Sequence, residues 1–210
     1  GGIGKTRAAL EYAHRYADEY TALLFVQADS AASLQQNLAS LSGPLVLDLA
    51  EKDARETEVQ VAAVLQWLQR HPGWFLILDN VDTDEAARAI QDVLARLSRA
   101  GQVVITSRLS QWEGAVETLA LDVLSVHAAG DFLLERTEKS RRKQGDDDAQ
   151  ARALAVELGQ LALALEQAGA YIVRYRTTFG GYMEEWQQSH DHVLEWFDER
   201  TMHYPRSVAS

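Results

Sequence analysis

The chain has 210 residues, of which 47% are hydrophobic and 3 are proline, so it is able to bury one large core or two smaller ones. Its formal net charge of −11 argues against non-specific binding to DNA or RNA, and its lack of cysteine excludes disulfides and thiolate metal sites. No apolar run approaches the roughly 18 residues needed to cross a bilayer, so we expect no membrane partner. A cysteine-free chain is compatible with the reducing cytoplasm, where we expect the protein to act.

The sequence begins with GGIGKT, the second half of the phosphate-binding pattern G-x-x-x-x-G-K-[ST]. The first glycine of that pattern would precede Gly1, so we expect a fragment that lacks the strand feeding the loop. Glycines let backbone N–H groups turn toward a phosphate, and the following helix points its positive end at the same charge. The pattern predicts that Lys5 reaches the β- and γ-phosphates and that Thr6 binds Mg²⁺. An ordinary glycine-rich helix start is the alternative.

Helical and strand patterns alternate after this loop. Helical spacing of apolar residues predicts helices at residues 5–20, 31–41, 56–70 and 84–99. Short apolar runs predict strands at residues 23–26, 74–78, 103–105 and, from a weaker pattern, 116–121. This alternation predicts a parallel sheet with helices on both faces.

The pattern changes after residue 122, where helical stretches follow one another at residues 126–137, 147–158, 161–175 and 181–198. We therefore expect an α/β subdomain over residues 1–122 and an all-helical subdomain over 123–200. A basic run at 139–143 and an acidic run at 146–148 are expected to form a solvated loop and an acidic helix N-terminus, which suits the helix dipole.

A second motif, FLILDNVD at residues 75–82, ends an apolar strand with Asp79. Ligands of open α/β sheets bind beyond the carboxyl ends of the strands, so Asp79 is a candidate for organising Mg²⁺ opposite the phosphate loop. A strand-end cap or turn former is the alternative role for this carboxylate.

A third motif, VVITSR at residues 103–108, also ends an apolar strand with polar residues. Arg108 is expected at the same edge of the sheet as Asp79, where it could neutralise a terminal phosphate. A surface arginine after a strand is the alternative.

Together, GGIGKT, LILDNVD, VVITSR and LGQLALALEQAGAYI (residues 158–172) resemble the ordered motifs of the NB-ARC domain of STAND nucleotide-binding proteins. This group includes plant resistance proteins, apoptotic protease-activating factors and bacterial and fungal proteins with tetratricopeptide repeats. The resemblance implies a P-loop α/β subdomain followed by a helical one, and an ADP/ATP switch in signalling. The segment YPRSV resembles the passage toward a winged-helix subdomain, so residues 201–210 would begin that linker.

The resemblance also implies roles for individual residues. Lys5 and Asp79 would be catalytic, and Thr6 and Asp79 would hold Mg²⁺. The nucleotide would be bound by Gly1, Gly2, Ile3, Gly4, Lys5, Thr6, Arg7, Arg108, Leu161 and Ala162. The implied partners are ADP or ATP, winged-helix and repeat domains of the same chain, and further copies of the protein on activation.

Two departures from the family pattern matter for function. Where the family has G-L-P-L, this chain has QLAL, so Gln160 and Ala162 replace the glycine and the proline. Asn80 stands where a second acid often follows Asp79, so we expect slow ATP hydrolysis that resets the switch. Two other classes remain open: an efficient P-loop ATPase or kinase, and an interaction scaffold that has lost its nucleotide function.

Overall fold

A computed structural model describes residues 2–97, 100–112, 114 and 116–188. The chain divides into two compact units, each with its own hydrophobic core. One unit, Lys5–Leu119, is here called the α/β unit. The other, the helical unit, comprises the described residues of Gly1–Gly4 and Ala120–Ser210.

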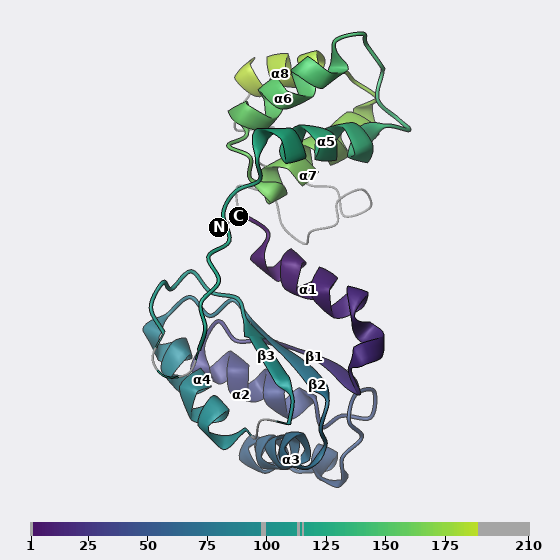
Figure 1. Ribbon diagram of the computed structural model, residues 1–210. Coiled ribbons are helices and arrows are strands. Elements are labelled where there is room, and N and C mark those ends of the chain that lie inside the picture. The colour runs from purple at the N-terminus through teal and green to yellow at the C-terminus, as the bar shows by residue number, and fades with distance from the viewer. Residues whose placement is uncertain (1, 98–99, 113, 115, 189–210) are drawn as a thin grey trace. The chain divides into compact units, whose positions relative to one another are not determined.

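The α/β unit is built on a parallel sheet whose strands follow chain order: β1 (Ala22–Gln27), β2 (Trp74–Asp79) and β3 (Gln102–Ile105). The strands lie side by side in the order β1, β2, β3 (Figure 1), with Leu24 beside Leu76 and Leu78 beside Ile105. The parallel pairing confirms the α/β sheet predicted from the apolar runs.

The helices of this unit have bounds close to those predicted: α1 (Lys5–Arg15) precedes β1, and α2 (Ala31–Ser40), α3 (Thr57–Arg70) and α4 (Asp84–Arg96) connect the strands. The Ser30 and Thr83 side chains cap α2 and α4 by accepting hydrogen bonds from backbone N–H groups in the first turn. The first helix is shorter than the predicted 5–20, because it ends at Arg15 and a 3₁₀ turn follows at Ala17–Glu19. A second 3₁₀ turn spans Ala50–Asp53.

The central strand, β2, is buried on both faces. Its side chains alternate, so Leu76 and Leu78 join the core formed with α2, α3 and α4, whereas Phe75 and Ile77 pack against α1. The outer strand β1 buries only one face in this way. Its other side chains, Leu23 and Phe25, are 39% and 44% exposed.

The weak strand prediction at residues 116–121 is wrong, because this segment has no regular secondary structure. A strand is stabilised by hydrogen bonds to a neighbouring strand, and within the described part of the chain this segment pairs with none. The apolar pattern of residues 116–121 is therefore not enough to form a strand without a pairing partner.

The helical unit contains α5 (Val126–Thr137), α6 (Asp147–Glu157), α7 (Ala162–Tyr175) and α8 (Phe179–Gln188). Its core gathers buried side chains from every one of these helices, including Leu133, Leu154, Leu165 and Tyr182. The predicted all-helical pattern is confirmed as far as Gln188, while the rest of the expected helix 181–198 and the linker 201–210 lie outside the described residues.

The charged segment between α5 and α6 is not simply solvated, which corrects the expectation for two of its residues. Arg141 and Asp147 are both buried, and the Arg141 Nη2 lies 2.9 Å from the Asp147 Oδ2. The same guanidinium lies over the ring of Phe179, and the Arg141 Cζ is 4.6 Å from the ring centroid. The ion pair therefore belongs to the interior of the helical unit.

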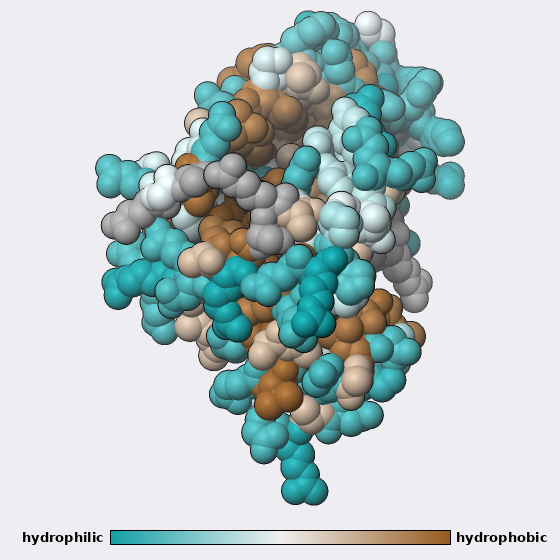
Figure 2. All heavy atoms as spheres, turned by 60° about the horizontal axis from the view of Figure 1, so that its bottom comes forward, coloured by the Kyte–Doolittle hydropathy of each residue, from teal (hydrophilic) through white to brown (hydrophobic). Residues whose placement is uncertain are grey.

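Hydrophilic residues cover most of the surface visible in Figure 2, and separate hydrophobic areas interrupt them. Within the described residues, no helix is both long enough and apolar enough to cross a membrane.

Candidate functional site

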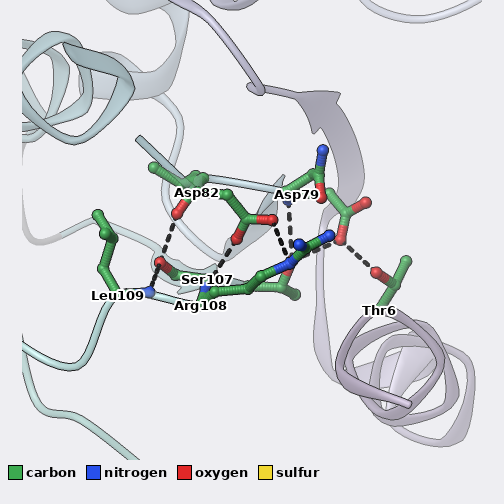
Figure 3. Close-up of polar contacts among 9 residues, drawn as sticks. Thr6, Asp79, Asp82, Ser107, Arg108 and Leu109 are labelled. Atoms are coloured by element: carbon green, nitrogen blue, oxygen red, sulfur yellow. Dashed lines mark hydrogen bonds and ion pairs between the residues drawn. The ribbon is translucent and has the colours of Figure 1, made fainter. Parts of the chain in front are cut away.

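Asp79 at the carboxyl end of β2 lies between two threonines. Its Oδ1 accepts a hydrogen bond of 2.6 Å from the Thr6 hydroxyl, in the first turn of α1. The same oxygen accepts a second hydrogen bond of 2.6 Å from the Thr106 hydroxyl, which follows β3 (Figure 3). The structure therefore brings together Thr6 and Asp79, the two residues predicted to hold Mg²⁺. It also places Thr106, which was not predicted, in contact with Asp79.

Strand register explains why Thr106 meets Asp79. Leu78 and Ile105 are paired at the ends of their strands, so the next residue of each chain segment, Asp79 and Thr106, are neighbours. Thr106 extends the pairing by one residue, since its N–H donates to the Leu78 carbonyl at 3.0 Å and its own carbonyl accepts from the Val81 N–H at 2.9 Å. Its side chain is thus held by backbone contacts on both sides.

Asn80 turns the chain immediately after Asp79. Its φ is +66°, in the left-handed region that asparagine tolerates better than most residues, and its N–H donates to the Thr106 hydroxyl at 2.9 Å. The left-handed conformation suits asparagine and aspartate alike, so it does not explain why asparagine replaces an acid here.

Arg108 lies beyond the end of β3 and is bound by Asp82. The Asp82 Oδ1 accepts a hydrogen bond of 2.7 Å from the Arg108 backbone N–H, and its Oδ2 forms an ion pair of 2.8 Å with Nε (Figure 3). The segment is further fixed because the Ser107 hydroxyl donates to the Val81 carbonyl. The loops after β2 and β3 are therefore tied to each other beyond the strands.

Two glycines of the GGIGKT segment, Gly2 and Gly4, have backbone conformations that favour glycine. Gly2 and Gly4 have φ of +81° and +96°, which residues with a Cβ rarely adopt. Within the helical unit, the Gly2 carbonyl accepts a hydrogen bond of 3.0 Å from the Leu163 N–H. A Cβ added to Gly4 would lie 3.4 Å from the Cβ of Ala162. Both glycines thus adjoin the start of α7.

The other predicted nucleotide-binding residues are placed as follows. Lys5 begins α1 and is half-buried, as is Ile3 before it. Arg7 is exposed and pairs with Glu11, one helical turn away, at 3.3 Å. Leu161 is the N-cap of α7 and makes no side-chain cap. Gly1 lies outside the described residues.

The oxygen atoms around Asp79 suit a hard divalent cation. Mg²⁺ is commonly held by one or two carboxylates together with substrate phosphates and water, so the Thr6 hydroxyl and the Asp79 carboxylate fit a Mg²⁺–nucleotide complex. Among the described residues, no group of three or more His, Cys, Asp or Glu side chains gathers into a protein-only metal site.

Thr106 was missed by sequence reasoning, which also did not predict that Asp82 would contact Arg108. Both follow an apolar strand run, as Asp79 and Arg108 do. Adjacent parallel strands end at the same edge of the sheet, so the residues that follow each strand lie side by side. The sequence could have indicated these contacts through that rule. Which of these residues meet depends on register, which the sequence did not provide.

Comparison with known proteins gives one distant similarity. The chain is 24% identical over 208 residues to a protein of Hyaloscypha variabilis named "Nucleotide-binding leucine-rich repeat (NLR)-like protein". The alignment covers 90% of this chain, whereas the chain spans only 20% of the relative's length. No protein-family model matches the chain.

Proposed function

We propose that this chain is the nucleotide-binding module of a signalling protein, which binds ADP or ATP with Mg²⁺ and hydrolyses ATP slowly. The similarity to a protein named as nucleotide-binding and NLR-like supports the coarser part of this proposal, a nucleotide-binding signalling module. The switch between ADP and ATP states is the finer part, and it rests on the site residues.

The observation that carries the proposal is the hydrogen bond between Thr6 and Asp79. These residues are separated by 73 positions in the sequence, yet the hydroxyl and carboxylate oxygens lie 2.6 Å apart. The motifs assign these same two side chains to Mg²⁺. A strand-end cap alone would not require the partner to be the threonine that closes a G-K-T sequence.

Each residue then has a distinct role. Lys5 neutralises the β- and γ-phosphates, and the backbone of Gly2 and Gly4 turns around them. Thr6 and Asp79 orient the cation, which when bound neutralises charge on the phosphate oxygens. Arg108 contacts the terminal phosphate of ATP.

The start of α7 contributes the remaining contacts. Leu161 and Ala162 would pack against the nucleotide, which is supported by the closeness of Ala162 to Gly4 within the helical unit. Exchange of ADP for ATP would then act on this unit and on the winged-helix and repeat domains of the whole protein, which would self-associate in the cytoplasm when activated.

The experiment that tests the proposal is isothermal titration calorimetry of the full-length protein with Mg·ADP and Mg·ATP. Lys5→Ala should weaken both affinities by at least about tenfold, or about 1.4 kcal/mol. Lys52→Ala is the matched control, because Lys52 pairs with Asp48 in another part of the α/β unit and should leave both affinities unchanged. Unchanged affinity in a folded Lys5→Ala protein would refute the phosphate site.

Steady-state hydrolysis separates the proposed switch from a working enzyme. Turnover well below about 1 s⁻¹ is expected, since enzymes with a metabolic or motor role commonly exceed that value. A faster rate would favour an efficient ATPase or kinase, and the absence of any nucleotide binding would favour a scaffold.

A further inference from the structure

Asp82 contacts Arg108 at two separate points. One carboxylate oxygen accepts from the backbone N–H at 2.7 Å, and the other pairs with Nε at 2.8 Å. The Asp82 side chain is only 21% exposed, whereas the Arg108 side chain is 65% exposed. One carboxylate thus fixes both the main chain and the side chain of the same arginine.

The part of Arg108 that Asp82 does not contact is the part that binds phosphates. An arginine has five N–H donors, and the ion pair with Asp82 is formed by Nε. Within the described residues, neither Nη1 nor Nη2 of Arg108 makes a hydrogen bond. These two nitrogens form the fork that binds a phosphate bidentately.

The loop beneath Arg108 is also fixed. The Leu109 N–H donates to the Ser107 hydroxyl at 2.9 Å, and that hydroxyl donates to the Val81 carbonyl (Figure 3). The Val81 N–H is in turn bound by Thr106. Restricting the root of a long side chain in this way reduces the entropy lost when its tip binds an anion.

We propose that Asp82 is a positioning residue, which holds Arg108 so that its terminal nitrogens bind the γ-phosphate and distinguish ATP from ADP. This inference rests on the proposed nucleotide binding. Because ADP lacks the γ-phosphate, the effect of Asp82 is confined to the triphosphate.

The sign of the effect distinguishes positioning from two other roles. If the Asp82 charge acted on the nucleotide directly, its removal would relieve repulsion and tighten ADP and ATP binding together. If Asp82 competed with the γ-phosphate for Arg108, its removal would tighten ATP binding alone. Positioning predicts the opposite result, weaker binding of ATP and unchanged binding of ADP.

A double-mutant cycle in the full-length protein tests the proposal, with calorimetry against Mg·ADP and a non-hydrolysable Mg·ATP analogue. Asp82→Ala should weaken binding of the ATP analogue by about fivefold and change that of ADP by less than about twofold. In an Arg108→Ala background, Asp82→Ala should have no further effect. Asp82→Asn keeps an acceptor for the backbone N–H, so it provides the same test with less risk to folding.

Asp84→Ala is the charge-matched control, because Asp84 is an exposed acid in the first turn of α4 and should not affect discrimination. Equal losses for both nucleotides, tighter binding of either one, or a further loss without Arg108 would each overturn the positioning role. Failure of the unaltered protein to bind any nucleotide would instead refute the proposed function, and this inference with it.

Discussion

At the Asp79 carboxylate, one oxygen accepts hydrogen bonds from two hydroxyls that reach it from different elements, Thr6 from α1 and Thr106 from beyond β3. Hydrogen bonds to a charged acceptor contribute about 1.5–3 kcal/mol each, more than bonds between neutral groups. Both hydrogen bonds end on Oδ1 of the carboxylate. A cation bound by Thr6 and Asp79 must replace the contact between them, whereas Thr106 is able to keep its bond and hold the carboxylate in place.

Substitution of Asn80 tests whether a missing carboxylate limits the rate of ATP hydrolysis. We expect Asn80→Asp to fold normally, because aspartate also tolerates a left-handed backbone, and to hydrolyse ATP faster if a missing base limits the reaction. Single-turnover hydrolysis by the full-length protein measures this.

Asn80→Gly is the matched control, since glycine accepts the φ of +66° without supplying a carboxylate. We expect its rate to equal that of the unaltered protein. Equal rates in the aspartate variant as well would assign the slow step to closure, product release or another base.

At the scale of the elements, the turn between α6 and α7 shows how a replaced motif residue affects the backbone. Gly159 and Gln160 have consecutive left-handed conformations, with φ of +62° and +55°. Gln160 is therefore a strained substitute at the very position where the related motif has glycine. The replacement affects the start of α7, which follows at Ala162.

Gln160→Gly should relieve this strain and stabilise the helical unit by about 0.5–1 kcal/mol, after allowance for the greater freedom of glycine in the unfolded chain. Urea unfolding followed by circular dichroism measures the change. Ala153→Gly, at an exposed position inside α6, should destabilise by about 1 kcal/mol. Destabilisation by both variants would show that the turn is not strained.

The buried ion pair between α5 and α6 leads to a second prediction for the elements. Asp147→Ala would leave the Arg141 guanidinium buried without its carboxylate, so we expect a loss of about 3 kcal/mol in unfolding free energy. The neighbouring Asp148 is 65% exposed and pairs with Arg152, so Asp148→Ala should cost less than about 1 kcal/mol. Similar losses in the two variants would contradict the interior role of Asp147.

For the whole molecule, the sequence predicted what depends on local pattern and missed what depends on partners. Strands β1, β2 and β3 were predicted because continuous apolar runs suit buried parallel strands. The strand predicted at residues 116–121 does not form, because no neighbouring strand pairs with this segment in the described part of the chain. The burial of Arg141 and Asp147 could not be predicted, because a run of charged residues is typical of an exposed loop. At the site, Thr6 and Asp79 followed from motifs, but the Thr106 and Asp82 contacts depend on register.

Separate cores in the two units predict separate thermal transitions. Leu165→Ala in the helical core should lower the unfolding free energy of the helical unit by about 3 kcal/mol, and with it the midpoint of that unit's transition, while the α/β unit is unchanged. Leu76→Ala should instead lower the unfolding free energy of the α/β unit alone. Scanning calorimetry of both variants measures this. A single transition shifted equally by both substitutions would mean that the cores unfold as one.

Strand β1 lies at the edge of the sheet, which bears on aggregation. Its sequence, ALLFVQ, carries neither charge nor proline, and Leu23 and Phe25 are exposed on one face. Within the described residues its only strand neighbour is β2, so the other side of β1 pairs with no strand. Such an edge is a template onto which another polypeptide can add as a further strand. We therefore expect β1 to be the strand of the α/β unit to which another polypeptide would add.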